Sequence, residues 1–391
     1  MTHSSTSATF APPVMEARRW LEGLSFCAQR PLINVSQAAP VEPPHPDLRA
    51  AIAEAALHDD AAHLYGPVLG LPELRAEVAA SVSRTYGGTV TADHVAITSG
   101  CNQAFAATIA SLCGAGDEVI LPTPWYFNHK MWLDMSSVRT VPLPTGQGMI
   151  PDAGEAEALI TAHTRAIVLV TPNNPCGVEY APDVIAQFAH LARRRGLKLI
   201  IDETYRDFHS QSGAPHDLFA DPDWADVVIQ LYSFSKAYRL TGHRVGAMVA
   251  APAQLAQVEK FLDTVTICAN QLGQRAALWG MRHLADWLAG EREEILARRG
   301  AIEAGFAPLA ARGWRLLGAG AYFAYVAHPF DIASNILAPR LVREAGLLML
   351  PGTMFMPETD PGGARQLRIA FANIDAIGIG AMYRRLEALE L

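Results

Sequence analysis

The chain has 391 residues, of which half are hydrophobic and 18% are charged, so it can build a large core and is neither disordered nor a coiled coil. A length of this size predicts about two domains. The formal net charge of -8 argues against a general nucleic-acid-binding protein, which would carry a basic stripe. No apolar run approaches the ~18 residues of a membrane span, so we expect no membrane partner.

The cysteines predict a reducing compartment. There are five, they are scattered along the chain, and none forms a C-x-x-C pair. This usage favours free thiols over a disulfide framework or a metal site. The start of the chain, residues 1–13, lacks the basic and apolar regions of a signal peptide. We therefore expect a soluble, cytoplasmic protein without a bound metal.

The first two thirds of the chain predict a layered α/β domain. A polar and Pro-rich arm (1–47) precedes an apolar-periodic helix at 48–57. Short apolar runs then alternate mostly with helical patterns, as expected for a mainly parallel seven-stranded sheet with helices on both faces. The predicted strands are 95–98, 118–122, 138–143, 167–171, 199–202, 227–232 and 245–250. This large domain is predicted to span 48–285.

The rest of the chain, 286–391, predicts a smaller α+β domain that the N-terminal arm joins. Its expected elements are a long helix at 286–311, a strand at 321–326, a helix at 339–345, a strand at 367–371 and a terminal helix from 375.

Ligands of open α/β sheets collect at the carboxyl ends of the strands, and polar residues follow several of the predicted strands. After 95–98 comes Ser99-Gly100-Cys101-Asn102, a Gly-containing turn that opens a helix and exposes backbone N–H groups suited to a phosphate. Asn173 and Asn174 follow 167–171, where they also suit an ordinary turn. Asp202 ends another buried strand, where a carboxylate needs a cationic partner.

The decisive residue is a lysine. Of 31 basic residues, 27 are Arg and only four are Lys. Lys236 follows the strand 227–232 in the sequence Ser233-Phe234-Ser235-Lys236, with Arg244 eight residues later. A desolvated ε-amine near other cations loses its proton easily and attacks a carbonyl to form an imine, which Arg cannot do. Phosphate-binding groups, a carboxylate for a ring cation and a reactive amine together match pyridoxal 5′-phosphate (PLP).

Seven motifs in order carry a family resemblance. They are Tyr65-Gly66-Pro67, Ser99-Gly100, Asn173-Asn174-Pro175-Cys176-Gly177, Asp202-Glu203-Thr204-Tyr205, Ser233-Phe234-Ser235-Lys236, Arg244-Val245-Gly246 and Leu367-Arg368-Ile369-Ala370. From about Asn34 to the C-terminus, the chain resembles the class I/II PLP-dependent aminotransferases of the aspartate aminotransferase fold (fold type I).

The resemblance implies a role for each matching residue. Lys236 would hold PLP as an internal aldimine and then move the substrate's α-proton. Asp202 would keep the pyridine nitrogen protonated. Tyr205 and Asn174 would donate to the phenolic oxygen of PLP. The groups implied for the phosphate are Gly100, Cys101, Asn102, Ser233, Ser235 and Arg244.

Further implied roles concern the ring face, the substrate and a second subunit. Tyr126 or its neighbour Trp125 would stack on the pyridine ring, and the position after Pro124 favours Tyr126. Arg368 would bind the substrate α-carboxylate, and Asn174 and Ala38 would also contact the substrate. Tyr65 would reach the phosphate of the neighbouring subunit, which implies a homodimer.

Three departures from the family pattern put the substrate in doubt. Ala38 stands where a glycine whose backbone approaches the substrate is frequent, Cys176 replaces a common Thr, and His243 replaces a common aromatic residue. Candidates for a side-chain pocket are Trp125, Phe127, Trp132 and Tyr322.

The resemblance implies transamination between an L-amino acid and a 2-oxo acid by a ping-pong mechanism. Elimination, cyclisation or decarboxylation at the α-carbon uses the same residues and stays an alternative. A non-catalytic aminotransferase-like binding module is a further one, although the set of Lys236, Asp202 and Arg368 argues against it.

Overall fold

A seven-stranded sheet organises the computed structural model, which describes residues 4–390. The strand order is β2-β8-β7-β6-β5-β3-β4, and only β8 runs antiparallel to its neighbours. The strands are β2 (Val95–Thr98), β3 (Glu118–Thr123), β4 (Arg139–Pro144), β5 (Thr164–Val170), β6 (Lys198–Asp202), β7 (Val228–Ser233) and β8 (Gly246–Val249). Each of the seven predicted runs forms a strand, which confirms the mainly parallel sheet.

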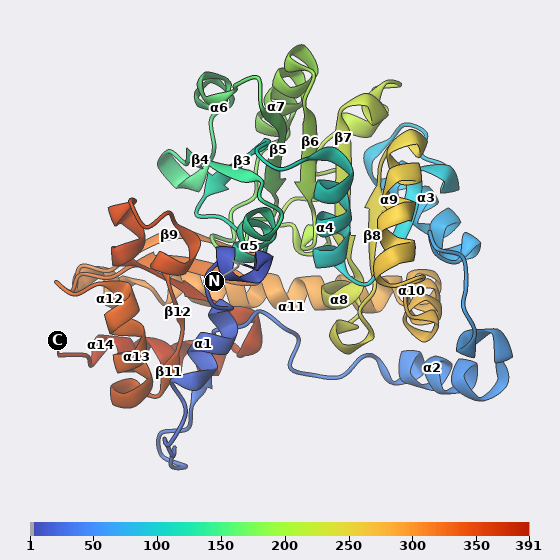
Figure 1. The fold of residues 1–391 in the computed structure, drawn as a ribbon. Helices are drawn as coiled ribbons and strands as arrows, with labels where there is room; N and C mark the ends of the chain where they lie inside the picture. Colours follow the sequence, from blue (N-terminus) through green and yellow to red (C-terminus); the bar gives the residue numbers. More distant parts are fainter. Residues whose placement is uncertain (1–3, 391) are drawn as a thin grey trace.

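Helices cover both faces of this sheet (Figure 1). Alternate residues of one strand point to opposite faces, so Ile167 and Leu169 of β5 join one hydrophobic cluster and Ala166 and Val168 join another. The helices of this part are α2 (Pro46–His58), α3 (Pro72–Tyr86), α4 (Cys101–Leu112), α5 (Phe127–Met135), α6 (Ala153–Leu159), α7 (Pro182–Arg195), α8 (Phe234–Ala237), α9 (Pro252–Val265) and α10 (Gln271–His283).

A smaller domain holds an antiparallel sheet of order β12-β13-β10-β9. Its elements are α11 (Ala285–Ala304), α12 (Ala307–Ala311), β9 (Arg315–Gly320), β10 (Phe323–Ala327), α13 (Ser334–Ala345), β11 (Leu347–Leu348), β12 (Leu350–Pro351), β13 (Gln366–Ile369) and α14 (Ala376–Glu387). The predicted boundary at residue 285 coincides with the first residue of α11 and stays a prediction.

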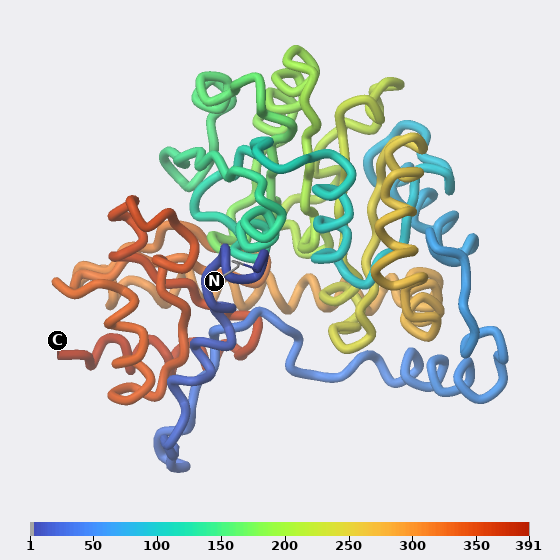
Figure 2. The backbone as a smooth tube through the Cα atoms, in the orientation of Figure 1, coloured from blue at the N-terminus to red at the C-terminus, as the bar shows by residue number. Residues whose placement is uncertain are grey.

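The N-terminal segment runs beside the smaller domain before it continues to α2 (Figure 2). It contains α1 (Pro13–Arg19) and β1 (Ile33–Asn34). β1 pairs in parallel with β11, with Ile33 opposite Leu347. Residues 33–34 of the N-terminal segment thus pair with a strand of the smaller domain.

Several elements of the smaller domain differ from the prediction: α13 begins at Ser334 rather than at 339, and β11 and β12 were not expected. The single helix expected at 286–311 is two helices, because α11 ends at Ala304 and α12 begins at Ala307. Gly305 lowers helix propensity at the break, and Pro308 lacks the N–H that a continuous helix needs. Strand β9 was not predicted, since its Gly318, Ala319 and Gly320 lack the β-branched residues typical of strands.

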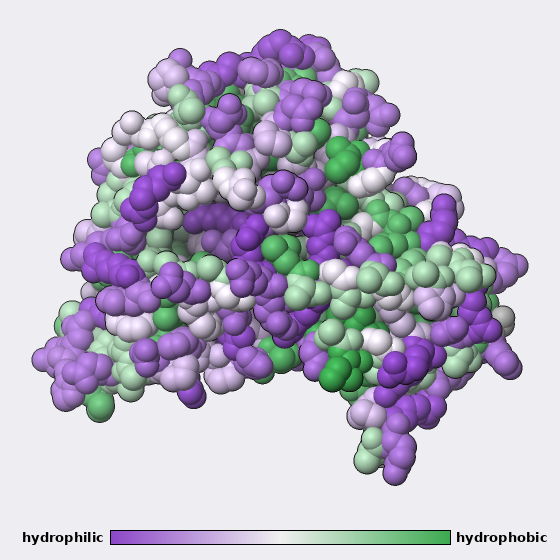
Figure 3. Space-filling model, turned by 180° about the vertical axis from the view of Figure 1, so that it is seen from behind, coloured by the Kyte–Doolittle hydropathy of each residue, from purple (hydrophilic) through white to green (hydrophobic). Residues whose placement is uncertain are grey.

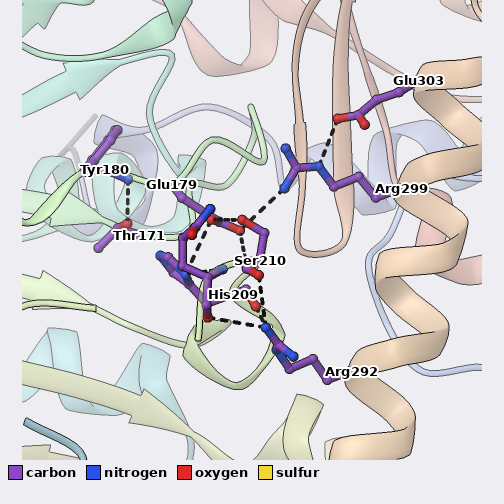
Figure 4. A network of polar contacts seen from close by, with 9 residues as sticks. Thr171, Glu179, Tyr180, His209, Ser210, Arg292, Arg299 and Glu303 are labelled. Carbon is purple, nitrogen blue, oxygen red and sulfur yellow. Dashed lines mark hydrogen bonds and ion pairs between the residues drawn. The ribbon is translucent and has the colours of Figure 1, made fainter. Parts of the chain in front are cut away.

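α11 is fixed to the large domain by a polar network (Figure 4). Arg292 donates from Nε to the carbonyl of His209 at 2.7 Å and from Nη2 to that of Ser210 at 3.1 Å. Glu179 accepts from the Ser210 backbone N–H at 2.7 Å and lies 3.7 Å from Arg299 Nη1. Arg299 also donates to Glu303 at 2.9 Å. One helix of the smaller domain is therefore joined to two loops of the large domain, one before α7 and one after β6.

Hydrophilic residues cover most of the surface seen from behind, and hydrophobic residues form separate patches (Figure 3). Within residues 4–390, no helix combines the length and the apolar character that a membrane crossing requires.

Gly177 lets the two domains approach closely. It has a φ of +75°, and a Cβ atom built there would lie 2.3 Å from the Phe323 carbonyl oxygen and 2.5 Å from the Gly320 nitrogen. The turn that contains Gly177 thus rests directly on the β9–β10 hairpin. The same turn carries Asn174, which lines the cavity at the carboxyl ends of the central strands.

Gly177→Ala should lower the free energy of unfolding by about 2–5 kcal/mol, from the left-handed backbone and from overpacking. The matched control is Gly196→Ala. Gly196 has a φ of +66° but no atom within 4 Å of a built Cβ, so it should lose only the about 1–2 kcal/mol of the backbone term. Denaturant titration measures both values. Equal losses of unfolding free energy in the two variants would show that the contact of Gly177 with the β9–β10 hairpin does not restrict the residue at this position.

Candidate active site

A cavity of about 460 Å³ lies at the carboxyl ends of the central strands and is completed by the smaller domain and the N-terminal segment. Of the residues proposed from the sequence, it is lined by Ala38, Cys101, Asn102, Tyr126, Asn174, Asp202, Tyr205, Ser233, Ser235, Lys236, Arg244 and Arg368. Residues separated by more than 300 positions therefore meet in one place.

Lys236 lies on α8, directly after β7, and lines this cavity. Its Nζ donates to the backbone carbonyl of Ala38 at 2.5 Å. Burial, reinforced by the positive charges of Arg244 and Arg368, lowers the pKa of Lys236 to about 7. A large fraction of this amine is therefore neutral and nucleophilic near neutral pH.

Asp202 ends β6 and provides a buried carboxylate. Its Oδ1 accepts from the Thr204 backbone N–H at 3.0 Å and from the Thr204 hydroxyl at 2.7 Å, and its Oδ2 lies 3.2 Å from His129 Nε2. Burial raises the pKa of Asp202, but His129 and Thr204 outweigh burial and hold the pKa below its ordinary value. The carboxylate is thus ready for a cationic group of a ligand.

His129 was not identified from the sequence. It comes from α5 and stacks on Phe105 with 3.9 Å between the ring centroids. It is only 2% exposed. The one available signal was its position three residues after Tyr126, behind the end of β3, and this spacing alone does not indicate contact with Asp202.

Groups that could hold an anion meet at the N-terminus of α4. Gly100 caps this helix with a φ of +87°, and a Cβ there would lie 2.3 Å from Arg244 Nη2. Arg244 also donates to the Thr241 carbonyl at 3.1 Å. The hydroxyls of Ser233 and Ser235 lie in the same wall. Helix N–H groups, hydroxyls and a guanidinium together suit a phosphate.

Arg368 provides a second buried cation, from β13 of the smaller domain. Its Nη1 donates to Asn174 Oδ1 at 2.9 Å and its Nη2 to the Ser36 carbonyl. Phe323 and Phe355 each lie 4.9 Å from the guanidinium carbon. Burial lowers the pKa of Arg368 to about 10, so it stays charged at neutral pH. Its Nε is buried without a protein partner and can bind a ligand carboxylate.

Only some of the aromatic candidates line the cavity. Tyr126 lines the cavity, and its hydroxyl donates to Asn102 Oδ1 at 3.2 Å. Trp125 is buried in the hydrophobic cluster of the neighbouring sheet face and does not line this cavity. Of the proposed side-chain pocket residues, Phe127 lines the cavity, whereas Trp132 and Tyr322 do not.

Two predicted residues lie outside the lining. Gly100 borders the cavity only as the cap of α4. Tyr65 is 80% exposed and does not line the cavity of its own chain. Lining residues that the sequence did not indicate include Val14, Gln37, Ala39, Asn128 and Thr204.

Comparison with known proteins identifies the family. The model of the family "Aminotransferase class I and II" matches residues 30–385. The chain belongs to this aminotransferase family. Within residues 4–390, no group of three or more His, Cys, Asp or Glu side chains is placed to hold a metal ion.

Individual relatives agree with this assignment. The chain is 31% identical to a valine–pyruvate aminotransferase of Mycobacterium tuberculosis over 87% of each chain. It is 27% identical to an aromatic aminotransferase of Arabidopsis thaliana over 83% of this chain and 81% of the relative. The solved N-succinyldiaminopimelate aminotransferase of M. tuberculosis superimposes with a TM-score of 0.88 at 25% identity, covering 100% of both chains.

The lowered pKa of Lys236 makes its reactivity testable. In protein freed of cofactor, acylation of Lys236 by trace acetic anhydride should be half-maximal near pH 7, since only the neutral amine reacts and its pKa is about 7 rather than 10.5. Peptide mass spectrometry over a pH series measures this, with the exposed Lys260 as internal reference.

Arg368→Gln removes one of the two positive charges that lower this pKa, so half-maximal labelling of Lys236 should shift to higher pH. Labelling of Lys236 only near pH 10 in the unchanged protein would contradict the electrostatic description of the site.

Proposed function

We propose that this aminotransferase binds PLP in the 460 Å³ cavity and moves an amino group between an L-amino acid and a 2-oxo acid by a ping-pong mechanism at Lys236. The observation that carries this proposal is the partly buried Lys236 amine, with a pKa of about 7, in the same cavity as the Asp202 carboxylate and the Arg368 guanidinium. An amine, a carboxylate and a carboxylate-binding fork are what the reaction requires.

The side chains present fit the cofactor. A Cβ at position 100 would meet Arg244, so only Gly leaves the N-terminus of α4 open at this point. When bound, PLP supplies an aldehyde for the amine and a protonated ring that withdraws electrons from the substrate α-carbon. We assign Asp202 to the ring nitrogen, Tyr205 and Asn174 to the phenolic oxygen and Tyr126 to the ring face. The phosphate-binding groups are Gly100, Cys101, Asn102, Ser233, Ser235 and Arg244.

The protein's own groups then perform three tasks. Lys236, with a pKa near neutrality, would accept a proton from the substrate α-carbon and deliver it to the aldehyde carbon of the cofactor. Arg368 holds the α-carboxylate, and its contacts with Ser36 and Asn174 fix the orientation of the fork. The ionised Asp202, supported by His129 and Thr204, preserves the charge on the ring.

Lys236 variants test the assignment. Borohydride reduction of the holoenzyme should attach the cofactor covalently to Lys236, detectable by peptide mass spectrometry. Lys236→Ala and Lys236→Arg should both lose this attachment and at least about 1,000-fold in transamination rate, because neither offers a neutral amine that can act as nucleophile and base. Lys260→Ala is the matched control and should behave like the unchanged protein. Attachment at another lysine would refute the assignment.

We further propose a homodimer in which Tyr65 completes the neighbouring site. Exposed apolar residues lie on both sides of a contact between residues 64–66 and residues 265–268, namely Leu64 and Tyr65 on the first segment and Val265 and Ile267 on the second. The Gly66 N–H donates to Cys268 Sγ at 3.4 Å and joins these segments. An exposed apolar surface of this kind suits contact with a second copy. A cytoplasmic location stays a proposal, supported by five cysteines that form no disulfide.

Mixing variants distinguishes a role of Tyr65 within its own subunit from one in the partner. Tyr65→Ala and Lys236→Ala homodimers should each have low activity. A heterodimer of the two has one site with both Lys236 and the partner subunit's Tyr65, so an equal, fully exchanged mixture should regain about a quarter of the unchanged activity. If Tyr65 acted within its own subunit, no intact site would form and mixing would restore nothing.

A further inference from the structure

The charges that line the cavity are all used by the proposed function. They are Asp202, Lys236, Arg244 and Arg368. Three of them face the cofactor, and Arg368 holds the substrate α-carboxylate. Among residues 4–390, the rest of the lining is uncharged. A second charge on a substrate would therefore find no counter-charge among the residues that this chain contributes to the lining.

α1 supplies part of this uncharged wall. Its Val14 lines the cavity together with Phe127. Ala17, one turn later on α1, is fully buried in a cluster that also contains Phe127, so the helix is anchored beside the site. Pro13, Glu16 and Trp20 instead border a separate cavity of about 780 Å³. The helix thus presents an apolar residue to the candidate active site and its carboxylate to the other cavity.

We propose that the site selects substrates with an uncharged side chain and that Val14 is the α1 residue in contact with it, an inference that rests on the proposed function. A carboxylate or ammonium beside Val14 and Phe127 would be buried without a partner, which is strongly unfavourable. In a ping-pong reaction the donor and the acceptor use the same site in turn. The 2-oxo acid therefore also carries one carboxylate, as pyruvate does, rather than two.

One nearby cation offers the competing explanation. Arg18 is exposed on α1, and its Nη2 donates to Gln37 Oε1 at 2.9 Å. Gln37 lines the cavity, but Arg18 does not. Recognition of a second carboxylate by this chain would require Arg18 to leave Gln37 and enter the cavity, so Arg18 belongs in the test.

The experiment follows the donor half-reaction on the holoenzyme, by the change in cofactor absorbance without an acceptor. Leucine and methionine should convert the cofactor at least about 100-fold more efficiently than aspartate, glutamate or lysine. Pyruvate should reverse the change at least about 100-fold more efficiently than 2-oxoglutarate. Comparable efficiency with acidic substrates would overturn the inference.

Substitutions at positions 14 and 15 test which residue of α1 determines the substrate preference. Val14→Arg should lower efficiency with leucine and raise it with aspartate, each by about 10-fold or more, whereas Val14→Leu should keep the original preference. Met15→Arg adds the same charge at the next, exposed position, which does not line the cavity, and should leave the preference unchanged. Equal effects of Val14→Arg and Met15→Arg would refute contact with Val14.

Two further outcomes separate the possible failures. Efficient use of glutamate that Arg18→Gln abolishes would replace this inference by recognition through Arg18 and leave the proposed function intact. A holoenzyme that no amino acid converts, with no cofactor attached to Lys236, would refute the proposed function and this inference with it.

Discussion

The structure of the site depends on two backbone carbonyls of the N-terminal segment. The Ser36 carbonyl accepts from Arg368, and the Ala38 carbonyl accepts from Lys236. Arg368 is buried and Lys236 is partly buried, and a cation removed from water needs an acceptor to offset the loss of hydration. Residues 36–38 thus hold the two positive charges that the chemistry needs, one from each domain. The side chain of residue 38 matters less for this contact than the course of its backbone.

The parts of the site that were predictable follow strands of the central sheet. Asp202 ends β6, Lys236 follows β7 and Gly100 follows β2, so the parallel architecture places them at one edge. The apolar runs that predict the strands, and the Gly and polar residues that follow those runs, indicated these positions without knowledge of tertiary contacts. Arg368 required the family resemblance, because a single Arg in a short strand carries no local signal.

The site residues that were not predicted are brought to the cavity by tertiary packing. His129 reaches Asp202 from α5, and Val14 reaches the cavity from a helix more than 200 positions before Lys236. Neither contact leaves a periodic trace in the sequence. The missed strand β9 has the same origin, since Gly318 and Gly320 are needed where the backbone of residues 176–177 lies against the hairpin. Close backbone contact requires small residues, and a strand built of small residues lacks the β-branched and aromatic side chains by which strands are predicted.

The pairing of β1 with β11 has a mechanical consequence. It makes the N-terminal segment, and with it the Ala38 carbonyl, part of the smaller domain, while Lys236 belongs to the large sheet. The hydrogen bond between them therefore spans the domain border, and a charged ammonium donates more strongly than a neutral amine. The charge on Lys236 therefore bears on the strength of a contact between the two domains. The amine that the proposed chemistry uses is thus also one of the groups that join them.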